Sequence, residues 1–461
     1  MDPNLRTPYS MHFSASFQRE LPGHTVVEAG YVGTLARRIL GKIDYAQYLD
    51  IRDTKSGADL FSAFQQIAKI ANIPPPGTSS RAAINPRDFN ALKTIQSIPF
   101  FDNMLPNMPA FLASEFSTAG YSTLTPTQAF YAFAVRAAAQ SWSCALFPLD
   151  TDPNFFGNPS PWNTTVDPQR DGMVLFQPQF SSLPGWTNFA NSNYHSLQLS
   201  VRRNMKNAAL AANYVWSKSI DNDSSPENAD FGANNNTTLT GLIQNPFNLR
   251  FGRALSDFDV RHNINANWTV DLPFGKGQRF GSNANRLLDA LIGGWEVVGT
   301  FRFHTGFPAG ITNGFNFPTN FFLTTPGTVT PGLVTQVTTE GTNKSTSGVS
   351  KGRPIPNLFK DAAAAYSFAN FTLPGSPGSR NVFRGPAYTD TDAGVNKRFK
   401  MPYNESHSIQ LRVAAFNVFN QVNFSTFVAN PEAQATFGNF SATAGPRGGA
   451  RELEFAARYE F

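Results

Sequence analysis

The first candidate for chemistry in the sequence is a possible serine nucleophile. Gly348-Val-Ser350-Lys-Gly352 matches the GxSxG pattern, which requires a sharp strand-to-helix turn and histidine and acid partners. The surrounding segment is rich in Thr, Ser and Gly, and no helical pattern follows it. The sequence therefore favours a loop over a nucleophile, and we predict no catalytic residue in the chain.

A second pattern could bind a cation. Asp221-Asn-Asp223-Ser-Ser225 begins like a calcium loop, because alternate carboxylate and amide oxygens can converge on one hard cation. Pro226 stands where such a loop requires Gly, and Gly232 replaces the bidentate Glu. The favoured interpretation is a solvated acidic loop start, and cation binding by residues 221–232 stays an open alternative.

Glycine, histidine and cysteine patterns point to no cofactor. Gly275-Lys-Gly277 followed by Gly281 misses the dinucleotide pattern GxGxxG by one residue and follows a strand that ends in a turn. The six histidines form no HExxH or comparable ligand pair, and the single Cys144 permits neither an intrachain disulfide nor a cysteine-based zinc site. We predict neither a metal nor an organic cofactor.

The composition indicates many short strands joined by long loops. Of 461 residues, 15% are charged and 41% hydrophobic, with 43 Phe, 35 Gly and 33 Pro, which excludes a coiled coil or a helical bundle. The net charge is only +5 and no basic run exceeds a pair, so we expect no nucleic-acid partner. No apolar run reaches the length of a transmembrane helix, and the first residues carry no secretory signal. If the protein is exported, we expect an additional N-terminal part.

Period-2 alternation then predicts the elements, because successive side chains of a strand point to opposite faces. Near residue 265, Ile264, Ala266 and Trp268 alternate with polar residues that we expect to face a wet lumen, namely Arg261, Asn263, Asn265, Asn267 and Asp271. The same alternation predicts nine strands near 9–21, 25–35, 194–203, 208–218, 260–272, 295–305, 391–401, 408–420 and 451–461.

The connections between these strands alternate in length. Short links separate long, irregular loops, within which only residues 58–71 and 127–142 have helical patterns; the long loops are 41–192, 219–257, 306–390 and 421–450. Outer-membrane barrels have short periplasmic turns and long extracellular loops. The fold class we predict is all-β: an antiparallel transmembrane β-barrel, partial because single-chain barrels normally have an even strand number and open edges are costly in lipid.

Aromatic residues on the apolar faces support a membrane location. Tyr9, Trp216, Trp268 and Trp295 suit the aromatic girdles of a membrane interface. The alternative is the core of a soluble β-sandwich, against which the Asn-, Ser- and Gln-rich opposite face argues. Lys397 interrupts one apolar face, and the sequence pattern offers no reason for it.

The C-terminal segment carries a further signal. Its apolar residues alternate and the chain ends on Phe, through Leu453, Phe455, Ala457, Tyr459 and Phe461. This resembles the terminal-strand signal that outer-membrane proteins present to the barrel assembly machinery.

Longer segments resemble the barrel of Oar-like TonB-dependent receptors, those with a carboxypeptidase-regulatory-like N-terminal domain. The resembling segments follow one another along nearly the whole chain: Asp2-Pro-Asn-Leu-Arg-Thr-Pro-Tyr9, Arg19-Glu-Leu-Pro-Gly23, Gly30-Tyr-Val-Gly33, Asn193-Tyr-His-Ser-Leu-Gln198, Trp216-Ser-Lys-Ser-Ile-Asp221, Ser256-Asp-Phe-Asp-Val-Arg-His262, Leu272-Pro-Phe-Gly275 and Phe416-Asn-Val-Phe-Asn420. The resemblance implies a plugged barrel of about 22 strands that imports scarce nutrients with energy from an inner-membrane complex. The family's signal peptide, coupling box, plug and early strands have no counterpart in this sequence.

We therefore expect the C-terminal barrel part of a TonB-dependent receptor, in the outer membrane of a Gram-negative bacterium with its C-terminus in the periplasm. The expected partners are the absent N-terminal plug and strands, the energy-coupling complex through them, outer-membrane lipid, the assembly machinery, and a small-molecule, saccharide or peptide ligand. The alternatives are a structural or adhesive surface β-protein without transport, and a secreted hydrolase on a β-scaffold, which the missing catalytic triad disfavours.

Overall fold

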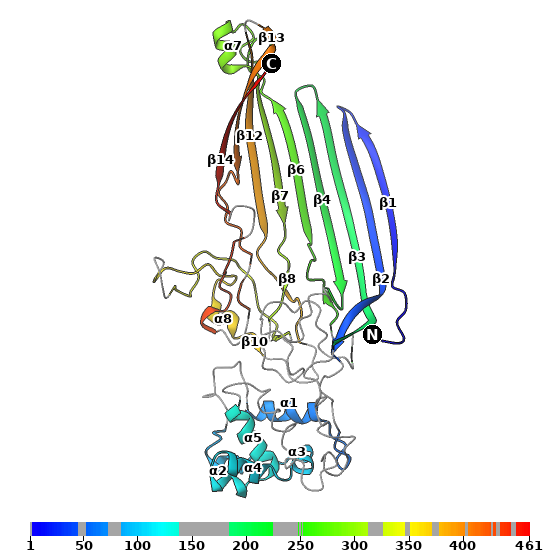
Figure 1. Cartoon of the computed structure of the whole chain (residues 1–461), viewed down its shortest axis with the longest axis vertical. Helices are drawn as coiled ribbons and strands as arrows, with labels where there is room; N and C mark the ends of the chain where they lie inside the picture. The colour runs from blue at the N-terminus through cyan, green and yellow to red at the C-terminus, as the bar shows by residue number, and fades with distance from the viewer. Residues whose placement is uncertain are drawn as a thin grey trace.

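The computed structural model describes residues 2–44, 52–71, 84–137, 184–224, 248, 250, 252–311, 326–345, 351–370, 378–401, 404–425, 427–429, 434–443 and 449–461. Most long strands in these residues belong to one antiparallel sheet, in which each strand lies beside the next along the chain (Figure 1). The strands, in order across the sheet, are β1 (Tyr9–Leu21), β2 (Thr25–Asp44), β3 (Pro184–Met205), β4 (Ala208–Asp221), β6 (His262–Asp271), β7 (Trp295–His304), β12 (Tyr388–Met401), β13 (Asn404–Phe416) and β14 (Glu452–Glu460).

The sheet is not closed, because among the described strands β1 and β14 each pair on one side only. Each of the nine predicted segments overlaps one of these strands. The fold is thus the predicted all-β antiparallel type, in a partial barrel. The open edges are β1, with 13 residues, and β14, with 9 residues. Each edge presents a row of unpaired backbone N–H and C=O groups that can pair with another strand.

Three strand ends, in β2, β3 and β13, differ from the prediction for local reasons. β2 and β3 run on to Asp44 and from Pro184, so the loop predicted from residue 41 to 192 is shorter at both ends. The alternation is lost at a register shift between Ala36 and Ile39, which hides the continuation of both strands from a period-2 analysis. The eighth predicted strand ends at Phe416 and not at residue 420, because Asn417 has a φ of 48° and turns the chain out of the sheet.

Short and long connections lie at opposite ends of the sheet. The short links are residues 22–24, 206–207, 272–294 and 402–403, and the long ones are 45–183, 222–261, 305–387 and 417–451. In Figure 1 the short links lie at the upper end and the long connections at the lower end. The link 272–294 contains the helix α7 (Arg286–Ile292), and the connection 222–261 contains β5 (Ala254–Leu255), which pairs with the end of β4. We call these ends the turn end and the loop end.

The strand register places the apolar side chains of all nine strands on one face. Phe13 is opposite Gly33, Leu197 is opposite Trp216, and Val413 is opposite Phe455. Large apolar side chains on this face are exposed: Tyr9, Met11, Phe13, Phe17, Leu21, Tyr31, Leu197, Leu199, Leu210, Trp216, Leu411, Val413, Leu453, Phe455 and Tyr459. A β-sandwich would cover them with a second sheet, so the sandwich interpretation fails. Such a continuous apolar surface suits lipid.

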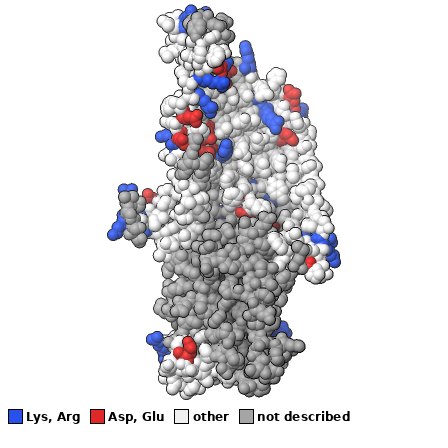
Figure 2. Space-filling view, viewed as in Figure 1, with Lys and Arg blue, Asp and Glu red and all other residues white. Residues whose placement is uncertain are grey.

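Charged side chains are distributed accordingly. In Figure 2 the middle of the sheet carries few of them, and they gather toward the two ends of the strands. No helix in the described residues is both long and apolar enough to cross a membrane.

The connection between β2 and β3 contains a helical unit where we predicted mainly irregular chain. It comprises α1 (Leu60–Ala71), α2 (Phe89–Leu92), α3 (Pro99–Met104), α4 (Met108–Glu115), the 3-10 helix η2 (Ala119–Thr123) and α5 (Pro126–Ala137). The predicted helices 58–71 and 127–142 correspond to α1 and α5, and residues 138–142 lie outside the described residues. The others were missed because they are too short to give a helical period.

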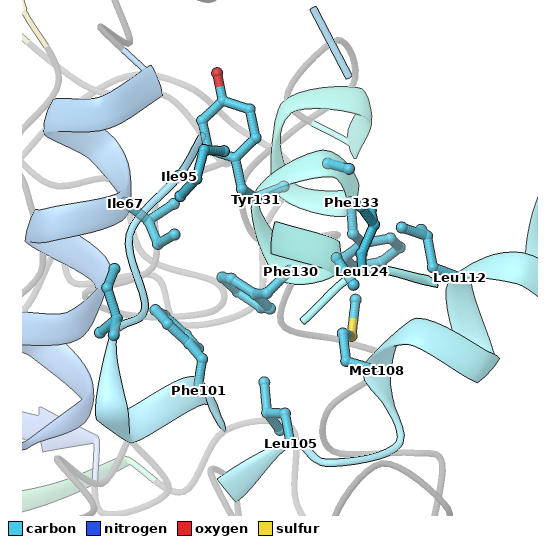
Figure 3. Close-up of a cluster of buried hydrophobic side chains, with 14 of the residues drawn as sticks. Ile67, Ile95, Phe101, Leu105, Met108, Leu112, Leu124, Phe130, Tyr131 and Phe133 are labelled. Carbon is cyan, nitrogen blue, oxygen red and sulfur yellow. The ribbon is translucent and has the colours of Figure 1, made fainter. Parts of the chain in front are cut away.

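The helical unit has its own apolar core (Figure 3). The rings of Phe101 and Phe130 stack with centroids 4.3 Å apart, and Phe64 meets Phe130 edge to face at 5.3 Å. All three side chains are fully buried, and burying each contributes about 1.5–3 kcal/mol. The loop is therefore built around a folded core.

A second, smaller core lies among the other long connections. There β8 (Pro308–Ala309) pairs with β11 (Phe383–Arg384), and β9 (Thr328–Val329) pairs with β10 (Ala369–Asn370), close to α8 (Ala362–Tyr366) and the 3-10 helix η7 (Gln434–Thr436). The core consists of Ile311, Leu358, Phe359, Ala365, Tyr366, Ala369, Phe383 and Phe437. The connection that precedes β12 and the connection between β13 and β14 are thus held together at the loop end.

Candidate functional site: the polar face and the loop base

The face of the sheet opposite the apolar one is polar across neighbouring strands. Four of the five residues predicted to face a lumen, Asn263, Asn265, Asn267 and Asp271, share this side of β6. Asn265 lies opposite Asn213 of β4 and Arg302 of β7, and its Nδ2 donates to Asn263 Oδ1 at 2.9 Å. Arg261, the fifth, precedes the strand, and its carbonyl accepts a hydrogen bond from Ser217 at 3.0 Å.

A hollow of about 380 Å³ lies in this face where β6, β7, β12 and β13 run side by side. Gly394, which has no side chain, and Ala414, which has a small one, lie in its wall and leave space between longer neighbours. The remaining residues that line it are Asn267, Trp268, Thr269, Val298, Gly299, Thr300, Arg302, Asp392, Ala393, Arg412, Ala415 and Phe416.

Charge in the hollow comes from two arginines and one aspartate. Arg302 and Arg412 are exposed, and neither guanidinium donates a hydrogen bond or forms an ion pair to another described residue. Asp392 accepts a hydrogen bond from the Asn417 backbone at 3.0 Å, so one carboxylate oxygen is already engaged at the strand end. The hollow can therefore offer charged donors to an anionic or polar group.

At the loop end, Arg380 joins three separate segments into what we call the loop base. Its guanidinium lies 3.0 Å from the Asp221 carboxylate and 2.9 Å from that of Asp257, and it donates to the Gly252 carbonyl at 2.8 Å. Burial opposes the charge of Arg380, but the carboxylates of Asp257 and Asp221 outweigh it and raise the Arg380 pKa above its ordinary value. A buried cation is tolerated here because it has full partners.

Arg384 makes a second link of the same kind. Its guanidinium pairs with the Asp259 carboxylate and donates to the Gly306 carbonyl at 3.0 Å. Asp259 also accepts the backbone N–H of Ser219 at 2.5 Å, and Ser219 and Ser256 hydroxyls meet at 2.7 Å. The Ser256 to His262 segment is thus a structural joint between the end of β4 and the connection that precedes β12.

These contacts correct the interpretation of Asp221 as a solvated loop start. Asp221 is 1% exposed and pairs with Arg380, so it belongs to the loop base. Among the residues that the structure describes, no group of three or more His, Cys, Asp or Glu side chains could hold a metal ion. Residues 225–232, and Gly348 to Ser350 of the serine pattern, lie outside the described residues.

The glycines after β6 have a conformational role. Gly275, Gly277 and Gly281 have φ values of 112°, 73° and 80°, which side chains with a Cβ rarely adopt. They fold the link into a compact turn in front of α7.

Four of the six histidines pair with tyrosines on neighbouring strands. Nδ1 of His195 lies 2.7 Å from the Tyr31 hydroxyl, and Nδ1 of His262 lies 2.8 Å from that of Tyr214. His304 stacks on Tyr388, and His407 contacts the Tyr459 hydroxyl. All four histidines lie in strands of the sheet, and the sequence pattern did not indicate their partners.

The predicted interface aromatics occur on the apolar face at two levels. Tyr9 begins β1 and Trp216 lies in the second half of β4, both toward the loop end. Trp295 begins β7 at the turn end, and Trp268 lies toward the same end of β6, where its ring covers Gly299. Such a two-level arrangement suits girdles at both membrane surfaces.

The predicted assembly signal occupies the edge strand β14. Leu453, Phe455, Ala457 and Tyr459 lie on the apolar face, opposite Ala415, Val413, Leu411 and Ile409 of β13, and Phe461 follows at the turn end with 91% of its surface exposed. Their role in assembly stays a prediction.

One lipid-facing side, one polar side and long folded connections at a single end define an outer-membrane β-barrel protein. The chain belongs to the outer membrane beta barrel domain family, whose profile matches residues 1–94 and 146–454. The outer membrane is accordingly its location.

Comparison with solved structures gives distant similarities. The outer membrane transporter YddB from Escherichia coli aligns with 99% of this chain and 33% of its own length, at 8% identity and a TM-score of 0.36. The FrpB iron transporter from Neisseria meningitidis, F3-3 variant, aligns with 100% of this chain and 32% of its own length, at 8% identity and a TM-score of 0.30. The chain thus spans about a third of the length of these transporters. None of the curated proteins matches the sequence.

Proposed function

We propose that the chain is the C-terminal wall of a TonB-dependent receptor of the Oar-like kind, which captures a scarce nutrient and imports it. The observation that carries this proposal is the polar face directly behind a lipid-facing apolar face. Its hollow contains two arginines that pair with no other described residue. A wall of this construction lines a passage for polar solutes.

The open edges support a second part of the proposal. β1 and β14 each leave one side without a strand among the described residues, and an unpaired edge in lipid costs several kcal/mol for each unsatisfied group. Additional strands supplied by an N-terminal part would close the barrel at about 22 strands, and a plug in that part would contact the polar face and couple to the energy-providing complex.

The lengths of the connections support a proposed orientation. Short links at the periplasmic side and long ones outside would set the C-terminal Phe461 in the periplasm and the helical unit, the small apolar core and the loop base outside the cell. The long connections would then capture the ligand, and the loop base would hold them over the passage.

The test is uptake by cells that produce the complete receptor. Labelled probes of three classes, a ferric siderophore, a malto-oligosaccharide and a dipeptide, are offered to cells with and without the energy-coupling complex. We expect one probe to accumulate only when the complex is present, and the double variant Arg302→Gln and Arg412→Gln to reduce its uptake. Arg203→Gln is the matched control, because Arg203 is an exposed arginine at the turn end of β3, away from the hollow and from the long connections.

Two outcomes would contradict the proposal. A folded protein in the outer membrane that accumulates none of the probes would favour the structural or adhesive alternative. Recovery of the protein as a soluble monomer, without heat-modifiable migration on gels, would contradict the whole assignment.

A further inference from the structure

The helix α7 lies in the link between β6 and β7 and carries an unusual surface for a short turn. Leu287, Leu288 and Leu291 are 84%, 45% and 69% exposed, so one apolar stripe of the helix has no cover. Three exposed cations, Lys276, Arg279 and Arg286, belong to the same link, which contains a single carboxylate, Asp289.

The helix has defined ends despite this exposure. Asn285 Oδ1 accepts the Leu288 N–H at 2.8 Å at the first turn, and the Gly293 N–H donates to the Asp289 carbonyl at 2.8 Å at the last. Asp289 Oδ1 accepts the Lys276 N–H at 2.5 Å and joins the helix to the preceding glycine turn. The leucines are therefore held in place on a fixed scaffold.

Two residues of the apolar face bind the end of α7 to the outside of the wall. The Trp295 indole N–H donates to the Leu291 carbonyl at 2.9 Å. Lys397 Nζ donates to the carbonyls of Leu291 and Gly293 at 3.0 and 2.6 Å and lies 4.8 Å from the Trp295 ring centre. These contacts explain the cation that interrupts the apolar pattern, since a lysine at a helix C-terminus satisfies its free carbonyls.

The contacts of α7 with the wall lie at the turn end of the apolar face. Lys397 is opposite Leu411, which is opposite Ala457, one alternation short of Tyr459 on the terminal strand. The end of the leucine stripe at Leu291 therefore lies beside the apolar face of the sheet, at its turn end. Apolar side chains beside cations are the composition of a helix that lies in a membrane interface.

We propose that α7 is an interfacial anchor that inserts Leu287, Leu288 and Leu291 into the leaflet at the turn end of the barrel, while Lys276, Arg279 and Arg286 bind phospholipid phosphates. The partner is the bilayer itself, because the helix that carries the stripe is bonded at its end to the lipid-facing surface and the cations complement anionic headgroups. This inference rests on the membrane location of the family and not on transport.

Spin labels test the proposal in the complete receptor, in which Cys144→Ser removes the native thiol. Labels at Leu287→Cys and Leu291→Cys are compared with one at Asn283→Cys, an exposed polar position of the same link. The protein is reconstituted in phosphatidylethanolamine vesicles that contain phosphatidylglycerol. We expect the ratio of collision with oxygen to collision with a water-soluble nickel chelate to be severalfold higher at 287 and 291 than at 283.

Vesicles of phosphatidylcholine alone test the cations. We expect the ratio at 287 and 291 to fall in these neutral vesicles, and the variant Lys276→Gln, Arg279→Gln and Arg286→Gln to remove the difference between the two lipids. Equal ratios at 287, 291 and 283 would overturn the insertion of the leucines. Labels shielded from both reagents, also in detergent, would overturn the lipid partner in favour of a protein one. An unchanged lipid difference in the triple variant would overturn the role of the cations.

Discussion

Arg380 and Asp221 are 3.0 Å apart, although one lies in the connection before β12 and the other at the end of β4. Their ion pair is almost completely inaccessible to solvent. A buried ion pair contributes little to the free energy of unfolding by itself, but the loss of one partner leaves a buried charge without compensation. The relative position of the two connections therefore depends on this contact.

Replacement of Arg380 by Gln should destabilise the loop base by about 3–5 kcal/mol, because the carboxylates of Asp221 and Asp257 would stay buried without a cation. The measurement is the temperature at which the folded band disappears in a heat-modifiability gel, together with proteolysis of the long connections. Arg353→Gln removes an exposed arginine and should change neither. Equal stability of the two variants would contradict the structural role of Arg380.

Gly306→Ala should also loosen the loop base. A Cβ at Gly306 would lie 1.9 Å from the Gly385 carbonyl oxygen, a backbone atom that cannot move aside as a side chain can. We expect a loss of about 1–3 kcal/mol, the usual cost of overpacking, measured by urea unfolding of the folded protein in vesicles. The control is Gly30→Ala, where a Cβ would have its nearest neighbour at 3.7 Å. A Gly306→Ala protein as stable as the control would show that the two connections can separate without cost.

Acid should weaken the helical unit through Asp53. Burial alone would raise the pKa of this carboxyl, but hydrogen bonds from Ser56, Asn103 and the Lys55 N–H lower it from 3.8 to about 2. Because the folded pKa is the lower one, the contribution to stability is complete above 3.8 and is lost as the pH falls through about 2.

The measurement for Asp53 is amide hydrogen exchange of α1 and α3 in the full chain, compared with Asp53→Asn. The variant should be less protected at neutral pH, because its amide nitrogen cannot accept the hydrogen bonds that the carboxylate accepts. The difference between the two proteins should shrink as the pH approaches 2. A difference that is independent of pH would contradict the assignment.

The strands could be predicted from the sequence because each has one apolar and one polar face, a local property that period 2 reveals. The ends of the strands could not be predicted in this way. The register shift after Ala36 and the left-handed backbone of Asn417 depend on the neighbouring segments of the chain and not on the local apolar pattern. The polar residues of β6 were found for the same reason as the strand itself.

The loop base and the hollow could not be predicted, because they depend on contacts between distant segments. Asp221 has the local sequence of a loop start, and only its partner Arg380 makes it a buried residue. Arg302 and Arg412 come from two strands that are not neighbours along the chain. The segment Ser256 to His262 leads into β6 and the segment Phe416 to Asn420 leads out of β13, but spacing alone does not give their contacts.

Lys397→Met should free the end of α7 from the wall. The variant loses both hydrogen bonds to the carbonyls of Leu291 and Gly293, as well as the cation over the Trp295 ring, while the length of the side chain is retained. The Leu291 carbonyl keeps the Trp295 indole N–H, but the Gly293 carbonyl loses the Lys397 donor. An unsatisfied buried carbonyl costs about 1–3 kcal/mol, so amide exchange of residues 286–294 should accelerate while that of β12 stays slow. Lys344→Met, an exposed lysine in a loop, is the control. Equal amide exchange of α7 in the two variants would contradict this role of Lys397. The helix would then be held by Trp295 and the glycine turn alone, and the lysine on the lipid-facing surface would have no structural explanation.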